Sequence, residues 1–403
     1  MEQIIKNLSA TDTINTEVSN PAKYLLQLCT IVFLGFLTLG ISLGTLPAFI
    51  TKTLHFDSFM VGIVIGIQSA ATLATRHFSG TICDTKGSKR SVLSGLLFCA
   101  ITGILYLLSN IVAQQPQLSI TILIAGRLVL GLGESLLITG ALSWGIGLMG
   151  TKYSGKVMAW NGISMYGALA FGAPIGMAIE NQLSLNWSFA FVIFLPVIAL
   201  TFAYRLKAVM PTGTMRIPFY KVLKSIWQQG TGLALATVGF GVIASFITLY
   251  FAQQHWQNAS LSLTIFGVAY ILARLFFSHL PDKHGGKIIA FFSLLVEAVG
   301  LICIWASTSS EMAFVGVALT GFGFSLVFPS LGVEAVKQVA PQNRGVALGA
   351  YVAFFDLALA VTGPATGIVA ERAGYASIYL LAAVASIIAV LLTHYQKTKK
   401  QIL

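Results

Sequence analysis

The chain has 403 residues, of which 56% are hydrophobic and only 9% charged, whereas a soluble domain carries about 25% charged residues. No soluble core could bury this much apolar surface, so the composition excludes a soluble globular protein and indicates one embedded in a bilayer. The net charge of +11 does not indicate a nucleic-acid partner, because the basic residues lie in short segments between apolar runs and reflect orientation in the membrane and anionic lipid.

Residues 1–22 are polar, include acids and lack the basic and short apolar regions of a signal peptide, so we expect a cytoplasmic N-terminal tail. After it, apolar runs of about 20 residues, enough helix to cross roughly 30 Å of hydrocarbon, predict an all-α integral membrane protein. A transmembrane β-barrel is excluded because its strands would show roughly ten-residue segments of alternating polarity. The twelve expected helices lie near 25–50, 58–80, 91–110, 118–141, 155–179, 187–208, 228–252, 261–281, 288–307, 312–335, 345–370 and 376–394.

The longest loop between these runs, 209–227, is basic and contains two prolines. It divides the chain into a six-helix bundle over 23–208 and another over 228–395, followed by a cytoplasmic tail at 396–403. The end of the loop, FYKVLKSIW, could form a short helix on the membrane surface. If both termini are cytoplasmic, most of the 24 Lys and Arg residues fall in cytoplasmic segments, so the positive-inside rule predicts that orientation.

Two stretches repeat one another: RHFSGTICDTKGSK at 76–89 and RLFFSHLPDKHGGK at 274–287. They align without gaps, and we call the shift that takes Arg76 to Arg274 the first offset. A second match has a slightly shorter shift, the second offset, and pairs Gly131, Gly133, Ser135, Gly155 and Pro174 with Gly321, Gly323, Ser325, Gly345 and Pro364. Ordered matches in equivalent loops and helices predict two parallel repeats related by an axis along the membrane normal.

The repeated loop combines residue types that suit a gate on the cytoplasmic side. Glycine is useful where a short turn needs a positive φ, and an aspartate there can pair with a basic side chain or accept from a helix N-terminus. Such a contact would form when the halves close and break when they open, whereas on the alternative interpretation the loop only fixes topology. The candidate gate residues are Arg76, Gly80, Asp84, Gly87, Lys89, Arg90, Arg274, Asp282, Gly285 and Lys287.

Four ionisable residues fall inside predicted spans: Arg127, Glu134, Glu297 and Asp356. A charge at mid-bilayer costs about 2.5–3.5 kcal/mol on insertion scales, so such side chains face a cavity or a partner. Arg127 and Glu134 are seven residues apart, which places them on one helical face roughly 10 Å apart along the axis. We expect these four residues to couple protons or to line the substrate cavity; the alternative is that they join helices through polar contacts.

GTICDTKGSKR, from Gly80 to Arg90, resembles the loop signature of the major facilitator superfamily at Gly80, Asp84, Gly87, Lys89 and Arg90. Arg127 with Gly131 and Gly133 resembles the span-four motif of its proton-coupled drug and sugar exporters. GISMYGALAFGAPIG resembles their span-five antiporter motif, although an alanine separates Gly172 from Pro174. That motif is carried by Gly167, Gly172, Pro174 and Gly176. Segments in spans four, ten and eleven look like the bacterial arabinose-efflux-permease-like exporters.

The resemblance implies the major facilitator fold, two six-helix bundles that rock around a central site. It favours a proton-coupled exporter (antiporter) of a small polar or amphipathic solute in the bacterial inner membrane. An importer or uniporter with the same fold stays open. A membrane enzyme or receptor is not favoured, because the sequence has no Walker loop, HExxH, GxSxG or large extramembrane domain. We expect a monomer driven by the proton gradient, without cofactor or metal, since the four cysteines lack ligand spacing.

Overall fold

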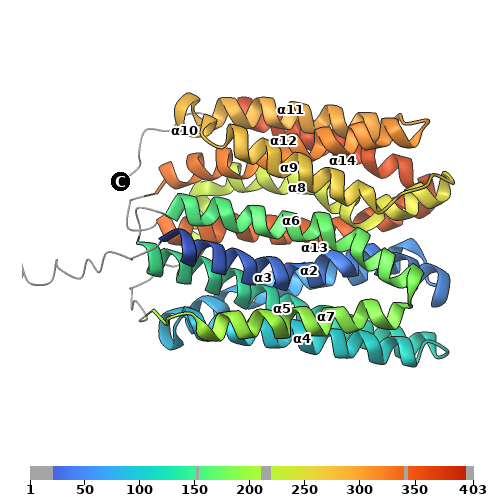
Figure 1. Cartoon of the computed structure of the whole chain (residues 1–403). Helices are drawn as coiled ribbons and strands as arrows, with labels where there is room; N and C mark the ends of the chain where they lie inside the picture. Colours follow the sequence, from blue (N-terminus) through green and yellow to red (C-terminus); the bar gives the residue numbers. More distant parts are fainter. Residues whose placement is uncertain (1–20, 151–153, 210–218, 340–343, 396–403) are drawn as a thin grey trace, which may run out of the picture.

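The computed structural model describes residues 21–150, 154–209, 219–339 and 344–395, which contain helices and no strand. The helices run side by side along one axis (Figure 1). Their bounds are α2 Pro21–Ala48, η1 Phe49–Thr53, α3 Ser58–Lys86, α4 Ser88–Ile111, α5 Pro116–Met149, α6 Ser154–Gln182, α7 Leu185–Arg205, α8 Phe219–Gln253, α9 Leu261–Phe277, α10 Leu280–His284, α11 Gly286–Trp305, α12 Ser310–Lys337, α13 Arg344–Ala373 and α14 Tyr375–His394.

The prediction of twelve membrane-length helices is confirmed. Within the described ranges, eleven helices are long and apolar enough to cross a membrane, and the 17-residue apolar helix α9 supplies the twelfth. The five-residue π-helix η1 continues α2 to Thr53. The eighth span, predicted over 261–281, ends as an α-helix at Phe277, and the short α10 follows it.

Helix α8 begins at Phe219, earlier than the sequence suggested. The stretch FYKVLKSIW therefore forms the first turns of α8 and is not a separate surface helix at the end of a 209–227 linker. No proline or glycine interrupts 219–229, so nothing in the sequence stops the helix from starting there. Val222 and Ile226, four residues apart, are buried in the main apolar cluster, which holds these turns against the protein.

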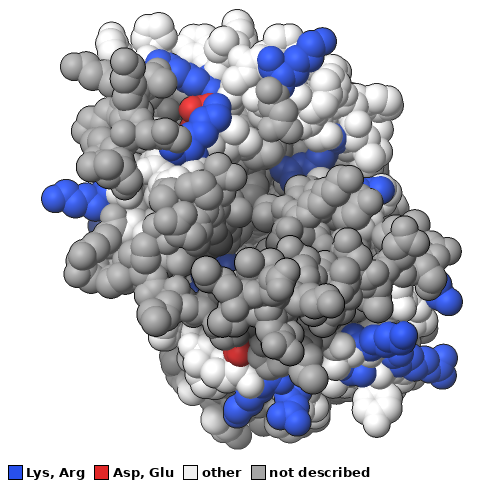
Figure 2. Space-filling model, turned by 90° about the vertical axis from the view of Figure 1, so that its left-hand side faces the viewer, with Lys and Arg blue, Asp and Glu red and all other residues white. Residues whose placement is uncertain are grey.

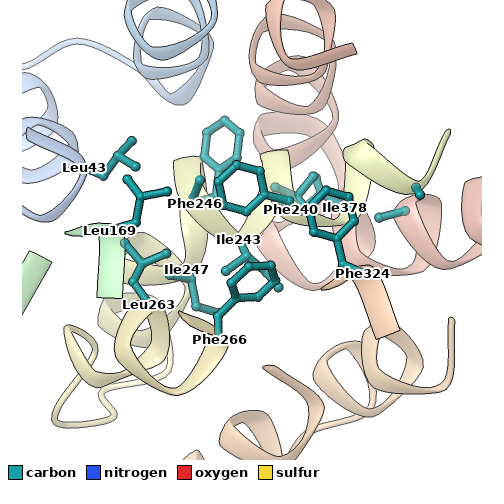
Figure 3. Packing of buried hydrophobic residues seen from close by; sticks show 14 of the residues in the cluster. Leu43, Leu169, Phe240, Ile243, Phe246, Ile247, Leu263, Phe266, Phe324 and Ile378 are labelled. Carbon is teal, nitrogen blue, oxygen red and sulfur yellow. The ribbon is translucent and has the colours of Figure 1, made fainter. Parts of the chain in front are cut away.

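Helices α2–α7 form the N-terminal bundle and α8–α14 the C-terminal bundle, coloured blue to green and yellow to red in Figure 1. The two bundles meet where α3 packs on α13 and where α6 packs on α9; we call these the α3–α13 seam and the α6–α9 seam. The apolar core continues across the boundary. Leu43 and Leu169 of the N-terminal bundle point toward Phe240, Ile243 and Ile247 of α8 (Figure 3).

The two bundles pack by the same rules at equivalent residues. A Cβ on Gly131 would collide with the carbonyl of Gln68, and a Cβ on Gly321 would collide with the carbonyl of Phe266. The two glycines are related by the second offset, and the two residues that they contact are related by the first offset. The contacts between bundles repeat as well. A Cβ on Gly66 would lie 2.7 Å from the Ala360 carbonyl oxygen, and the Thr264 hydroxyl donates to the equivalent oxygen of Ala170 at 2.6 Å. The chain is therefore an internal duplication in three dimensions.

The repeated loops turn on glycines in a conformation that other residues rarely adopt. Gly87 joins α3 to α4 with φ 91° and ψ 148°, and Gly285 joins α10 to α11 with φ 90° and ψ 138°. The expectation that these turns need a positive φ is confirmed. Each turn lets the next helix start within one residue of the previous one, which fixes the direction of α4 and α11.

We expect Gly285→Ala to destabilise the protein by about 1–3 kcal/mol, the cost of a residue held in a sparsely populated backbone region. Nothing lies within 4 Å of a Cβ at this position, so the cost comes from the backbone alone. Thermal unfolding of the purified protein measures it. The matched control is Gly349→Ala, since Gly349 is a helical residue of α13 with equally open space; that change should leave the midpoint unchanged or raise it. Equal unfolding midpoints for Gly285→Ala and Gly349→Ala would contradict the backbone strain expected of an alanine at position 285.

Candidate functional site

A cavity lies between the two bundles at about the middle of the helices. The space in it that can hold the centre of a water molecule is about 60 Å³. Polar side chains come almost entirely from the N-terminal bundle: Gln68, Ser69, Arg127 and Glu134, with Ser245 from α8. The remaining lining is apolar or aromatic, from α2, α3, α6, α8 and α13: Phe36, Leu39, Leu43, Ile65, Met165, Tyr166, Leu169, Phe240, Gly241, Ala244, Phe355 and Leu359.

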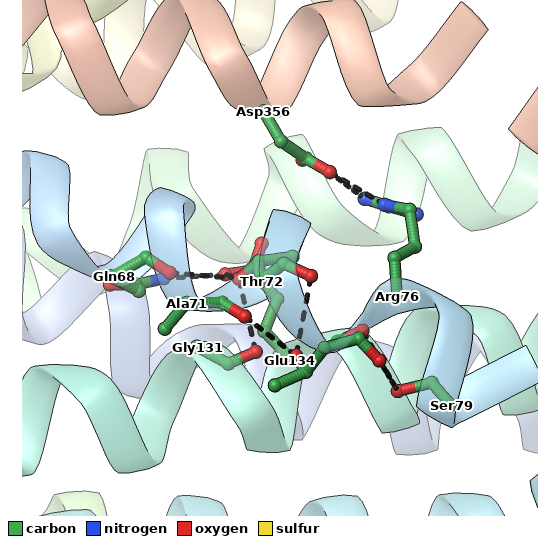
Figure 4. Close-up of polar contacts among 10 residues, drawn as sticks. Gln68, Ala71, Thr72, Arg76, Ser79, Gly131, Glu134 and Asp356 are labelled. Carbon is green, nitrogen blue, oxygen red and sulfur yellow. Dashed lines mark hydrogen bonds and ion pairs between the residues drawn. The ribbon is translucent and has the colours of Figure 1, made fainter. Parts of the chain in front are cut away.

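Glu134 of α5 presents a carboxylate to this cavity. Its Oε2 accepts from Gln68 Nε2 at 2.6 Å and from Thr72 Oγ1 at 3.2 Å, both on α3 (Figure 4). The Thr72 hydroxyl also lies 3.0 Å from the carbonyl oxygen of Gly131. Among the residues that the structure describes, no lysine or arginine forms an ion pair with Glu134. The carboxylate is thus held by neutral groups beside a solvent-reachable space.

Arg127 lines the same cavity, but its guanidinium is directed at the protein. Nε and Nη2 donate to the carbonyl oxygens of Val64 and Ile65 at 2.9 and 3.2 Å. Nη1 lies 3.4 Å from the Tyr106 hydroxyl, and the residue is only 2% exposed. Arg127 and Glu134 thus reach one cavity, as their spacing suggested, while Arg127 also fastens α5 to α3. Their roles in coupling stay predictions.

Asp356 and Arg76 form an ion pair across the α3–α13 seam. Asp356 Oδ2 lies 2.6 Å from both Nε and Nη2 of Arg76 (Figure 4). The two side chains are 5% and 16% exposed, so the pair is shielded from water. Asp356 does not line the cavity, although its neighbours Phe355 and Leu359 do. The sequence analysis named both residues as candidates but did not pair them. Their opposite charges, on helices of different bundles, were the sequence feature that could have suggested the pair.

Arg274, the repeat equivalent of Arg76, lies in the α6–α9 seam without a carboxylate partner among the described residues. Nη2 donates to the Ser325 carbonyl oxygen at 2.7 Å, and the guanidinium lies 4.9 Å from the ring centroid of Tyr270. The residue equivalent to Asp356 at the second offset is Tyr166, whose ring stacks on Tyr270 with centroids 3.8 Å apart. Sequence reasoning missed Tyr166, which the same offset would have found.

The loop between α3 and α4 is held within the N-terminal bundle. Lys89 Nζ donates to the carbonyl oxygens of Tyr204 and Leu206 at 2.6 Å each, at the end of α7, and so caps that helix. Gly80 is buried, Asp84 and Lys287 are half-buried and Arg90 is exposed. The side chain of Asp282 lies outside the described residues. The role of this loop as a cytoplasmic gate stays a prediction.

Glu297 lies elsewhere than the substrate cavity in which the sequence analysis grouped it. It is fully buried inside the C-terminal bundle, where Ser386 Oγ lies 3.4 Å from its Oε1. Its repeat equivalent at the first offset is Cys99. Cys99 packs against Gly133 and Glu297 packs against Gly323, and these two glycines are related by the second offset. The apolar sequence around Glu297 could not reveal which face of α11 it occupies. Any part in proton coupling stays a prediction.

The glycines of the antiporter-like motif pack α6 against α2 inside the N-terminal bundle. A Cβ on Gly172 would lie 2.6 Å from the Cα of Gly40, and one on Gly176 would lie 2.9 Å from the Ile41 carbonyl oxygen. Gly167 has ordinary space, at 3.6 Å from Ile271 and Phe33. Pro174 lies inside α6. The motif therefore sets how closely two helices that line the cavity approach.

The α3–α13 seam is closed tightly at the end where α3 begins. The hydroxyls of Ser58 and Tyr375 are 2.6 Å apart, and the backbone N–H of Phe59 donates to Glu371 Oε1 at 2.8 Å. One turn further along, Gly62 meets the backbone of Gly363 without room for a side chain. The sequence analysis did not single out these residues, because their contacts join the start of one bundle to the end of the other.

We expect Gly62→Ala to open this end of the molecule, because the new methyl group would collide with backbone that cannot move aside. Overpacking costs about 1–3 kcal/mol, which shifts the population of the closed arrangement by roughly fivefold or more. The measurement is the rate at which a membrane-impermeant maleimide, added on the Ser58 side, labels a cysteine placed at the cavity residue Leu43. Native cysteines are replaced by serine throughout.

Gly349→Ala in the same background is the control, since Gly349 lies away from the α3–α13 contact and has open space. Labelling at the same rate in Gly62→Ala and the control would contradict a seam closed by glycine contacts.

The opposite end of the molecule is basic. Figure 2 shows Lys and Arg side chains around its rim. The exposed basic residues at the helix ends on this side are Lys23, Lys86, Arg90, Lys156, Arg205, Lys207, Lys224, Lys283 and Lys337. At the other end the described helices expose only Lys52 and Arg372. The charge asymmetry thus runs along the helix axis.

Comparison with known proteins agrees with this architecture. The family model for the Major Facilitator Superfamily matches residues 28–258 and 230–401. An uncharacterized MFS-type transporter of Salmonella typhimurium is 42% identical over 370 residues, 92% of this chain and 95% of the relative. One of Burkholderia pseudomallei is 46% identical over 364 residues, 90% of this chain and 89% of the relative. The crystal structure of the human organic anion transporter MFSD10 (TETRAN) superposes with a TM-score of 0.73 at 14% identity, covering 93% and 99% of the two chains.

Proposed function

The chain belongs to the major facilitator superfamily and is a multi-pass membrane transporter, and from this premise we propose that it exports a small polar or amphipathic solute in exchange for protons. In parallel-repeat transporters the substrate site lies at the interface of the halves, which rock so that the site faces each side in turn. The cavity between the two bundles is the matching site here.

One observation carries the proposal: a carboxylate, that of Glu134, faces the cavity, and the hydrogen-bond donors that hold it among the described residues are neutral. A proton or a substrate group arriving in the cavity therefore competes for the same oxygens. Protonation removes the charge and lets Gln68 and Thr72 release or reorient, whereas a substrate bound to the charged form excludes the proton. Mutual exclusion at one carboxylate is sufficient for exchange of the two.

The Arg76–Asp356 pair supplies a second element of the proposed cycle. Breaking it is required for α3 to separate from α13, and a shielded ion pair opposes that separation unless the carboxylate is neutralised or another charge replaces a partner. The ion pair lies close to the Glu134 carboxylate, because Arg76 is one helical turn along α3 from Thr72, which donates to Glu134. Proton entry at Glu134 would therefore occur near the contact that holds the bundles together.

The orientation proposed is the one in which the basic rim of Figure 2 and both termini face the cytoplasm of a bacterial cell, with the protein in the inner membrane as a monomer. The closed end at Ser58, Gly62 and Tyr375 is then periplasmic. In this arrangement the contacts at Ser58 and Gly62 close the periplasmic end of the α3–α13 seam, and an exporter would load from the opposite, cytoplasmic side.

Everted membrane vesicles energised by respiration test the proposal. Protons accumulate inside and quench a fluorescent ΔpH probe, and an antiported compound from a panel of sugars, amines and carboxylates should restore fluorescence as protons leave. Vesicles without the protein correct for weak bases that collapse the gradient by themselves. Compounds that bind the purified protein, detected by thermal shift, yet never restore fluorescence would overturn proton exchange. Accumulation of those compounds by intact cells would instead support an importer or uniporter, which the same geometry accommodates.

A further inference from the structure

The polar group around Glu134 and an aromatic cluster packed behind Phe240 on the opposite side of the cavity occupy equivalent positions of the repeat but differ in chemistry. Gln68 corresponds to Phe266 and Thr72 to Tyr270 at the first offset, and Glu134 corresponds to Phe324 at the second. The three polar residues form the hydrogen-bonded group around Glu134. Each of the three has an aromatic residue as its counterpart in the C-terminal bundle. Phe266 and Phe324 do not line the cavity themselves, but Phe240, which packs on both, does, so a solute in the cavity meets hydrogen-bonding groups and an aromatic ring.

The aromatic cluster is continuous. Phe240 stacks on Phe324 with centroids 5.9 Å apart, and its ring lies 5.3 Å from Phe266 and 5.5 Å from Tyr166. Phe240 and Tyr166 line the cavity themselves, beside Phe355. Figure 3 shows the rings of Phe240, Phe266 and Phe324 within this apolar packing. Such a cluster favours an apolar or aromatic body, and its ring faces attract a cation.

The polar group around Glu134 offers unfilled hydrogen-bond acceptors. Gln68 is 3% exposed; its Nε2 donates to Glu134, while its Oε1 has no hydrogen-bond partner. A carboxylate only accepts, so the amide must turn its nitrogen toward Glu134 and its oxygen away. A buried acceptor without a partner costs free energy, which a ligand that donates to it would recover.

Among the described residues that line the cavity, the one cationic donor, Arg127, is by contrast directed at the protein. All three nitrogens of the Arg127 guanidinium have protein partners, in Val64, Ile65 and Tyr106. An anionic ligand would compete with those carbonyl oxygens for Arg127 and would lie beside the Glu134 carboxylate. The cavity-facing carboxylate and the unpartnered Gln68 oxygen therefore favour a ligand that donates hydrogen bonds and carries positive charge.

We propose that this cavity binds amphipathic organic amines, with the protonated amine at Gln68 Oε1 and the Glu134 carboxylate and the apolar body against Phe240 and Phe355. The inference rests on the proposed function only in taking the cavity as the transport site. It adds the substrate class: a compact cation that carries N–H groups at one end and an aromatic or alkyl group at the other.

Isothermal titration of the purified full-length protein in one detergent tests this with three probes that share one body: 4-phenylbutylamine, 4-phenylbutanol and 4-phenylbutyrate. We expect the amine to bind about tenfold more tightly than the alcohol, because hydrogen bonds to charged groups are the stronger ones. Glu134→Gln and Gln68→Leu should each weaken the amine about tenfold and leave the alcohol within about twofold.

The control variant is Glu311→Gln, an exposed acid at the start of α12 whose carboxylate accepts from Ser310; it should leave all three affinities unchanged. Gel filtration and unfolding midpoints identify any variant that fails to fold. If one variant fails, the other variant tests the proposal, together with the order of the three affinities on the unmodified protein. Equal or tighter binding of the carboxylate probe, or of the alcohol, would overturn the proposal.

These outcomes separate the substrate class from the direction and coupling of transport. If amines bind in a Glu134-dependent way but release no protons from everted vesicles, the amine site is supported and proton exchange is contradicted. If a sugar or a carboxylate drives proton release and amines do not bind, proton exchange is supported and the amine site is contradicted.

Discussion

Asp356→Asn is expected to abolish proton-driven transport and to destabilise the protein. The change leaves the Arg76 guanidinium at the α3–α13 seam without its carboxylate, at the point where both Nε and Nη2 now lie 2.6 Å from Oδ2. Removing one partner of a buried pair costs about 3–5 kcal/mol; since the Arg76 side chain is 16% exposed, we expect the lower end of that range. Unfolding midpoints and fluorescence recovery in everted vesicles measure the two effects.

The double variant Arg76→Gln with Asp356→Asn separates the charge imbalance from the loss of the pair. It should recover most of the stability, because two neutral amides leave no unpaired charge in the seam, but it should not recover transport driven by the proton gradient. Full transport by Asp356→Asn alone would remove the ion pair from the mechanism. Equal stability of the single and double variants would show that the pair does not hold the seam.

Glu134→Gln is expected to abolish energised transport while preserving exchange of substrate for substrate. Glutamine has the same shape but no carboxylate, so the cavity loses the group at which proton and solute exclude each other. The bundles can still move, because the seams and the Arg76–Asp356 pair are unchanged. The measurement compares fluorescence recovery in everted vesicles with counterflow of a radiolabelled substrate in proteoliposomes without a pH gradient.

The expected result for Glu134→Gln is loss of the first activity, by at least about tenfold, with the second retained once the substrate concentration is raised about tenfold to offset the weaker binding. Glu311→Gln, which changes an exposed acid far from the cavity, should retain both. If Glu134→Gln still moved solute uphill at the normal rate, the proton would have to enter through another group. Loss of both activities in a folded variant would assign Glu134 to substrate binding alone.

Composition and internal repetition were enough to predict the fold. The apolar runs predict membrane-spanning helices because no other open-ended element satisfies its backbone in lipid. The two ordered sets of matches predict two like halves, and the shared collisions at Gly131 and Gly321 show why glycine is required at both places. The positive φ of Gly87 and Gly285 follows from the same residue types in the same short turns.

The site could be predicted only in part, because its contacts join distant segments. The sequence identifies Arg76, Arg127, Glu134 and Asp356 as charges that require partners, but it does not say which partners. Arg76 and Asp356 meet only because α3 and α13 cross between bundles. Glu297 has the same apolar context as Glu134, yet α11 turns it toward Ser386 and away from the cavity. Nothing in the sequence marks Gln68, whereas Tyr166 could have been found as the repeat equivalent of Asp356.

The unlike contacts at the two seams give the two sides of the molecule different parts in the movement. Stacked rings such as Tyr166 and Tyr270 can slide or tilt over one another while staying in touch, because their attraction varies slowly with angle. The Arg76–Asp356 contact is directional and either intact or lost. The α6–α9 side would therefore keep its ring contact through the cycle, while the α3–α13 side makes and breaks its ion pair, so that the two halves of a duplicated chain would contribute unequally to the movement.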